Sequence, residues 1–120
     1  MADAPEAVVW HNQRCSKSRG ACDLLTEQGV VFETRNYITN PPTRDELESV
    51  LSMLGDTDPK AITRLGEDKS KELGLKTASR DELLDALVAN PELIERPIVI
   101  SSDGKAVVGR PPELVLGLFN

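Results

Sequence analysis

The sequence is poor in aromatic residues, which make up 3% of its 120 positions. The core must therefore be built chiefly from Leu, Val, Ile and Ala. No apolar run approaches the roughly 18 residues that a membrane-spanning helix requires, and the first six residues lack the basic and apolar segments of a secretory signal. These absences favour a cytoplasmic protein that does not insert into a membrane.

Basic residues are also scarce, with 14 Lys and Arg against 20 Asp and Glu, for a net charge of −6. This balance argues against a nucleic-acid-binding protein. The single His and the two Cys cannot form a four-ligand zinc site without carboxylates, and no spacing suggests such a site. We therefore expect no metal, and we expect the chain to act as a monomer.

A length of 120 residues suits one domain with a real core. Residues 8–10 and 30–37 are predicted strands, joined by a helix over 17–28 that begins after Ser16 and ends before Gly29. Such a β-α-β unit places the two strands parallel, with a right-handed crossover.

The middle of the chain is predicted to be helical. Thr43 to Glu46 and Ser79 to Glu82 have the spacing of capping boxes, and each precedes an apolar helical repeat. The second of these helices is expected to bury Val88 among its leucines. Between them, Asp58-Pro59 is expected to open a short helix that carries Arg64.

The end of the chain predicts a strand from about residue 97, a turn at Asp103-Gly104, an antiparallel strand and a last helix through about residue 119. The complete order is β-α-β, helices, then β-β-α. This order predicts an α/β fold with a thioredoxin-like mixed sheet, forming one domain over 1–120 with a helical insertion at about 41–95.

Cys15 follows the first predicted strand and stands at the start of the first predicted helix. The unpaired N–H groups and the dipole at a helix N-terminus stabilise a thiolate, as do nearby basic side chains. Such surroundings lower a cysteine pKa from about 8.5 into the range of roughly 3.5–7.5. The same N–H groups can hold a small oxyanion beside the sulfur.

Cys22 lies seven residues after Cys15, which corresponds to roughly 10 Å along a helix. A disulfide requires Cα atoms within about 7 Å of each other. We therefore expect no disulfide between the two while the helix is intact. Cys22 is interpreted as a buried helical residue, with a resolving role as the alternative.

Two kinds of thiol site are disfavoured. Ser18 occupies the position at which a Cys-x-x-Cys pair would need its second cysteine, and Ala21 stands where a phosphatase loop would need arginine. One activated thiol remains, with His11, Ser18 and Arg19 as neighbours that either assist it or have only a structural role.

Arg96 and Arg110 each precede a proline at the boundary of a predicted element, where the backbone is stiff. In a thioredoxin-like sheet, the residue before the third strand faces the loop with the cysteine. Either arginine is a candidate anion ligand or an exposed side chain. By periodicity alone, Arg64 is a helix surface residue.

Several motifs in one order resemble the glutaredoxin-coupled arsenate reductase family. They are His11-Asn12-x-x-Cys15, Ser18-Arg19, 40–47, 71–75, 90–99 and Gly109-Arg110-Pro111. The resemblance implies that Cys15 is the catalytic cysteine and that His11 activates it. It also implies a cis Arg96-Pro97 bond and three oxyanion-binding arginines, which are Arg64, Arg96 and Arg110.

The resemblance implies reduction of arsenate to arsenite, with Ser18 and Arg19 as further substrate-binding candidates. It implies no bound cofactor, and it makes glutathione and glutaredoxin the external reductants. Two alternatives remain open: a glutathione-linked thiol-disulfide oxidoreductase, and a non-enzymatic regulatory protein of the same fold.

Overall fold

The computed structural model describes residues 5–12, 14–56, 58–110 and 112–119. Its contacts define two compact units, one formed by residues 1–40 and 96–120 and the other by residues 41–95. The second unit has the bounds of the predicted insertion, and the single domain stays a prediction. Pro111 of the last motif and the first four residues, on which the leader prediction partly rests, lie outside the described residues.

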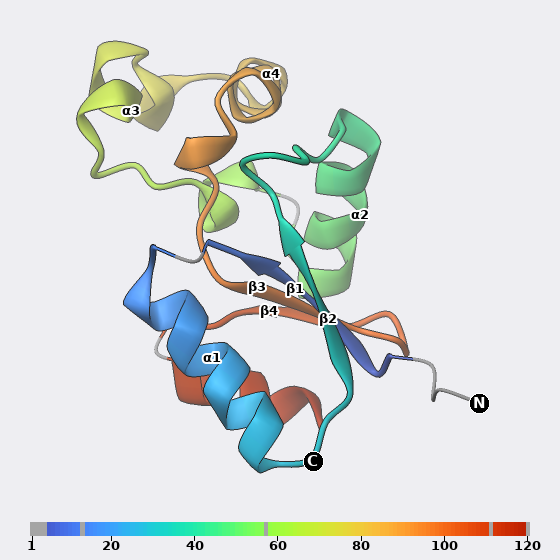
Figure 1. Ribbon diagram of the computed structural model, residues 1–120. Coiled ribbons are helices and arrows are strands. Elements are labelled where there is room, and N and C mark those ends of the chain that lie inside the picture. The colour runs from blue at the N-terminus through green and yellow to red at the C-terminus, as the bar shows by residue number, and fades with distance from the viewer. Residues whose placement is uncertain (1–4, 13, 57, 111, 120) are drawn as a thin grey trace. The chain divides into compact units, whose positions relative to one another are not determined.

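The first unit is built on a four-stranded mixed sheet in the order β2-β1-β3-β4. Its strands are β1 (Ala7–His11), β2 (Phe32–Asn36), β3 (Ile98–Ser101) and β4 (Ala106–Val108). β1 pairs with β2 in parallel, whereas β1 with β3 and β3 with β4 are antiparallel (Figure 1). This arrangement confirms the predicted mixed sheet, and the hairpin turns at Gly104, whose φ is 85°.

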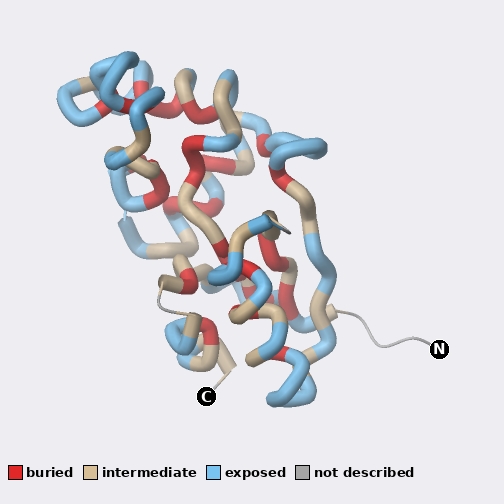
Figure 2. The backbone as a smooth tube through the Cα atoms, turned by 60° about the vertical axis from the view of Figure 1, so that its left-hand side comes forward, coloured by how far each residue is buried: buried red, intermediate tan, exposed pale blue. Residues whose placement is uncertain are grey.

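One face of this sheet packs against α1 (Ser16–Glu27) and the 3-10 helix η4 (Pro112–Leu118), as Figure 1 shows. The buried cluster between them takes residues from the sheet and both helices: Ala7, Val9, Ala21, Leu25, Val99 and Val115. The central strands β1 and β3 contain most of the buried sheet positions, whereas β2 and β4 are half-buried or exposed (Figure 2). The core consists chiefly of Leu, Val, Ile and Ala, as predicted, and Trp10 and Tyr37 are buried as well.

The second unit is helical. Its elements are α2 (Arg44–Leu54), η1 (Pro59–Ile62), α3 (Asp68–Glu72), η2 (Leu75–Thr77), α4 (Arg80–Ala89) and η3 (Pro91–Leu93). Both predicted capping boxes are present, because Thr43 caps α2 with Glu46 and Ser79 caps α4 with Glu82. Leu83, Leu84 and Leu87 are buried as predicted.

Two predictions in this unit were wrong. Val88 is 39% exposed because the buried face of α4 is narrower than its apolar pattern. Arg64 does not lie on the helix that Asp58 opens, since η1 ends at Ile62. Thr63 instead forms a bridge with Ile94, which draws the chain out of the helix. In the described part of the chain, no helix is long and apolar enough to cross a membrane.

Candidate active site

Cys15 is the N-cap residue of α1, one position earlier than the Ser16 that the sequence predicts. Its backbone is extended, with φ −99° and ψ 120°, and its carbonyl accepts the first helical hydrogen bond, from the Arg19 N–H at 3.1 Å. The thiol is therefore attached where the helix dipole has its positive end and where the first N–H groups lack helical partners.

The surroundings of Cys15 lower the pKa of its thiol below the ordinary value. Partial burial acts in the opposite direction and raises the pKa, but three hydrogen bonds outweigh it. They come from the backbone N–H of Ser18, from the side chain of Arg96 and from the backbone N–H of Lys17, and the Arg96 charge adds to them. Cys15 thus has the depressed pKa that the sequence predicts for a thiol at a helix N-terminus.

Arg96 immediately precedes Pro97 and β3, and the Arg96-Pro97 bond is cis, as the resemblance implies. Partial burial lowers the pKa of its guanidinium, but the hydrogen bond with Cys15 and the proximity of Tyr37 outweigh this and raise the pKa. Its Nε atom is buried and makes no hydrogen bond to any described residue. Arg96 is therefore an arginine that the structure brings directly to the sulfur.

Tyr37 is a member of this site that sequence reasoning missed. It follows the last residue of β2, it is fully buried, and it interacts with Arg96. No local pattern predicts this role, because the contact joins residues 59 positions apart in the chain. That it is the single Tyr of the sequence is the one available hint.

Ser18 contributes through two different groups. Its backbone N–H faces the sulfur of Cys15, whereas its buried side-chain hydroxyl accepts a hydrogen bond from the Asn12 N–H at 3.4 Å. The hydroxyl thus holds the loop after β1 against the first turn of α1. This arrangement supports the predicted proximity of Ser18 to the thiol.

His11, at the end of β1, lies against Cys22, with 3.9 Å between His11 Nδ1 and Cys22 Sγ. Burial and the charge of Arg19 lower the pKa of His11, so the neutral imidazole is favoured. Burial and the charge of Asp23 raise the pKa of Cys22. Among the described residues that lower the pKa of Cys15, His11 does not appear, and its activating role stays a prediction.

Both cysteines are free thiols, and the intact helix from Ser16 agrees with the expectation that Cys15 and Cys22 do not pair. In the ranges that the structure describes, no group of three or more His, Cys, Asp and Glu side chains could hold a metal.

The other two predicted arginines have different settings. Arg110 lies in the same unit as Cys15, in the segment between β4 and η4, and its N–H donates to the Val108 carbonyl at 3.0 Å. Arg64 belongs to the second unit, where its guanidinium pairs with Glu67 and donates to the Glu92 carbonyl at 3.5 Å. Oxyanion binding by either arginine stays a prediction.

The model of the ArsC family matches residues 10–118. The chain belongs to the ArsC family. The match begins in the last two residues of β1 and continues through the Cys15 loop, the helical unit and the final hairpin to the end of η4.

Relatives in the ArsC family match over nearly their whole length. An arsenate reductase of Neisseria meningitidis is 44% identical over 111 residues, covering 91% of this chain and 94% of the relative. The Escherichia coli protein YfgD, whose name states no activity, is 46% identical over 113 residues, covering 92% and 94%. The solved arsenate reductase of Vibrio cholerae is 39% identical, with a TM-score of 0.91 and coverage of 98% and 100%. This likeness confirms the thioredoxin-like ArsC fold.

Proposed function

We propose that this ArsC-family protein is an arsenate reductase in which the Cys15 thiolate is the nucleophile. The observation that carries the proposal is the hydrogen bonding of the Cys15 sulfur by Arg96 and by the first N–H groups of α1. The same donors suit a tetrahedral oxyanion that approaches the sulfur. The names of the Neisseria and Vibrio relatives support arsenate as that oxyanion.

In the first step, the Cys15 thiolate attacks the arsenic atom of arsenate. A sulfur–arsenic bond forms, one arsenic–oxygen bond breaks, and the oxygen leaves as water after taking up protons. Arsenic is still As(V) in this adduct. Arg96 neutralises charge on the oxyanion as the sulfur comes close, which reduces the repulsion between two anions.

In the second step, a thiol such as glutathione attacks the Cys15 sulfur. A sulfur–sulfur bond forms, and the sulfur–arsenic electron pair stays on arsenic, which leaves as arsenite. The two thiols have together lost two electrons, and As(V) has gained them. Glutaredoxin then reduces the mixed disulfide and regenerates Cys15. A cytoplasmic location, where glutathione keeps thiols reduced, fits this cycle.

Oxyanion binding is assigned to Arg96 together with Arg110, and Ser18 and Arg19 are further candidates; for Arg64, which belongs to the other unit, the role implied by the resemblance stays a prediction. Phosphate has a similar charge and shape, so these cations alone cannot distinguish it from arsenate. Selective turnover instead follows from the chemistry, because thiols reduce As(V) readily and do not reduce phosphate. Phosphate is thus expected to compete for binding without consuming reductant.

The test is arsenate-dependent NADPH consumption in the presence of glutathione, glutaredoxin and glutathione reductase. Cys15→Ser should abolish the rate, whereas Cys22→Ser serves as the matched control and should retain it. A rate that survives in Cys15→Ser would refute the assigned nucleophile. A loss of activity in Cys22→Ser would instead support a resolving role for that residue.

The depressed pKa of Cys15 also favours a second candidate, a glutathione-linked thiol-disulfide oxidoreductase, which equally needs a thiolate. The two functions differ in their use of the oxyanion. A reductase of arsenate predicts that arsenate protects Cys15 from alkylation and that Arg96→Ala stops turnover. A disulfide oxidoreductase predicts neither effect.

A further inference from the structure

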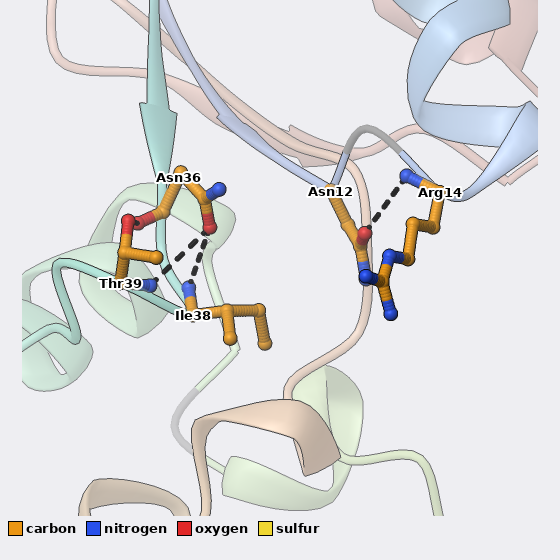
Figure 3. Close-up of a pocket in the computed structure, with 5 residues that line it drawn as sticks. All are labelled: Asn12, Arg14, Asn36, Ile38 and Thr39. Atoms are coloured by element: carbon orange, nitrogen blue, oxygen red, sulfur yellow. Dashed lines mark hydrogen bonds between the residues drawn. The ribbon is translucent and has the colours of Figure 1, made fainter.

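A hollow of about 460 Å³ opens beside the Cys15 loop within the first unit. Its lining residues come from the loop after β1, from the end of β2 and from the turn that follows it: Asn12, Arg14, Asn36, Ile38 and Thr39. The volume falls within the roughly 300–1,000 Å³ typical of small-molecule sites. Figure 3 shows the two groups of residues on opposite sides of it.

The amide side chains of the hollow are held in known orientations. Asn12 Oδ1 accepts a hydrogen bond from the Arg14 N–H at 3.0 Å. Asn36 Oδ1 accepts from the N–H groups of Ile38 at 3.0 Å and Thr39 at 3.3 Å. Asn36 Oδ1 thus accepts two hydrogen bonds and Asn12 Oδ1 accepts one, and the NH₂ group of each asparagine can act as a donor to a ligand.

The hollow therefore offers mainly hydrogen-bond donors. The guanidinium of Arg14 adds a positive charge and makes no ion pair with any residue that the structure describes. Arginine binds carboxylates well, because its planar fork can donate two parallel hydrogen bonds. Ile38, which is 40% exposed, gives the hollow an apolar wall. This combination suits a carboxylate on a short, partly apolar backbone.

Both segments that line the hollow are also connected to groups around the Cys15 thiol. The Cys15 N–H donates to the Asn12 carbonyl at 2.9 Å, so the loop that lines the hollow also fixes the nucleophile. On the other side, Tyr37 lies between the lining residues Asn36 and Ile38 in the chain and interacts with Arg96. A molecule held here is therefore adjacent to the groups that surround the sulfur.

We propose that this hollow binds a carboxylate of the peptide thiol that resolves the Cys15 adduct, and so positions its sulfur for attack. The inference rests on the proposed function, because it concerns the second thiol of that reaction. Glutathione is the probe of this class, since it is a tripeptide with two carboxylates and one thiol. Arg14 and the NH₂ groups of Asn12 and Asn36 are assigned as its ligands.

The first experiment measures binding without chemistry. S-methylglutathione, whose thiol is blocked, is titrated into the ¹⁵N-labelled wild-type protein. The amide signals of Arg14, Ile38 and Thr39 should shift, and Arg14→Gln should weaken the binding about tenfold. Shifts confined to other regions, or shifts of these amides with phosphate but not with S-methylglutathione, would overturn the proposal.

The second experiment separates binding from structure. Asn36→Asp keeps an oxygen to accept the two turn hydrogen bonds, but replaces the NH₂ donor with a negative charge. It should raise the KM for glutathione by about tenfold or more while leaving the KM for arsenate unchanged. Lys105→Gln removes one positive charge from the β3–β4 turn and is the matched control, with an unchanged KM for both.

Replacing glutathione with dithiothreitol, a thiol without carboxylates, separates a failure of the proposed glutathione pocket from a failure of the proposed arsenate reductase activity. Arg14→Gln should then reduce arsenate as fast as the wild type. If the wild type reduces arsenate with both thiols and Arg14→Gln alters the KM for neither thiol, the assigned pocket is wrong, but the proposed reductase function stands. If the wild type is inactive with both thiols, the proposed function fails, and S-methylglutathione binding alone decides the pocket.

Discussion

The Nδ1 atom of His11 lies 3.9 Å from the Sγ atom of Cys22, the cysteine with the raised pKa. The contact joins the end of β1 to the middle of α1, and it places the imidazole beside the thiol that burial makes less acidic. Two sites of opposite character are therefore built on one helix: an N-terminal thiol stabilised as thiolate, and an interior thiol kept neutral.

His11→Gln should leave the pH midpoint of Cys15 alkylation nearer to that of the wild type than Arg96→Gln does, because Arg96 acts on Cys15 directly. Its effect on stability should depend on pH. The pKa of His11 is lowered from 6.5, so its contribution is present above that value and is lost as the pH falls through the folded pKa.

The measurement for His11 is urea unfolding of the wild type and His11→Gln at about pH 8 and about pH 5. The unfolding free energy of the wild type minus that of His11→Gln should be larger at the higher pH. An equal difference at both values would contradict the lowered pKa.

Arg96→Gln should raise the pKa of Cys15, because it removes a hydrogen bond and a positive charge from the thiolate. Its kcat/KM for arsenate should fall at least about tenfold, the loss expected for a charge-assisted hydrogen bond. Iodoacetamide alkylation followed against pH gives the midpoint directly. Lys105→Gln controls for the change in net charge. If Lys105→Gln shifted the alkylation midpoint of Cys15 as much as Arg96→Gln does, the effect of Arg96 would not be local.

Gly109→Ala should destabilise the first unit and disturb the Arg96 side of the site. A Cβ at residue 109 would lie 2.9 Å from Pro97 Cγ, closer than real Cβ contacts come, and 3.0 Å from Val115 Cγ1, tighter than most real contacts. Overpacking of this kind costs about 1–3 kcal/mol. Because the strain falls on Pro97, we also expect the pKa of Cys15 to rise.

Gly66→Ala is the matched control, since its Cβ would meet nothing within 4 Å. Thermal or urea unfolding of the two variants checks the prediction. Equal stability of both would show that the segment before β3 accommodates the methyl group.

Ser18→Ala should cost about 1 kcal/mol, because the Asn12 N–H loses its acceptor in a partly buried setting. The backbone N–H of Ser18 remains, so the pKa of Cys15 should move less than in Arg96→Gln. Ser102→Ala, at an exposed serine, controls for the loss of a hydroxyl. If Ser18→Ala displaced the alkylation midpoint of Cys15 as far as Arg96→Gln does, the Ser18 hydroxyl rather than its N–H would be the group that stabilises the thiolate.

The parts of the fold that the sequence predicts are those set by neighbours in the chain. The capping boxes at Thr43 and Ser79 were confirmed because each rests on residues three positions apart. The hairpin at Gly104 follows from the conformation that a tight turn demands. The parallel pairing of β1 with β2 was predicted because a helix between two strands is the usual crossover of a parallel pair.

The errors arose where distant segments decide. Arg64 lies outside η1 because Thr63 pairs with Ile94. The pattern of residues around Arg64 does not indicate a partner about 30 positions away. The contact between Arg96 and Tyr37, and that between His11 and Cys22, likewise depend on how separate elements pack. The place of Cys15 at the start of α1 was predicted correctly because a helix start is a local feature, although the N-cap itself was assigned to Ser16.

The parallel ladder between β1 and β2 pairs His11 with Asn36. Both strands thus end at the same level, and the Cys15 loop and the turn after Asn36 leave the sheet side by side. An insertion of one residue into β2 would reverse the alternation of its side chains. It would move the Asn36 donor away from the Cys15 sulfur without replacing either residue. The alignment of two short strands, rather than any single side chain, thereby sets the distance between Cys15 and the proposed binding site of the second thiol.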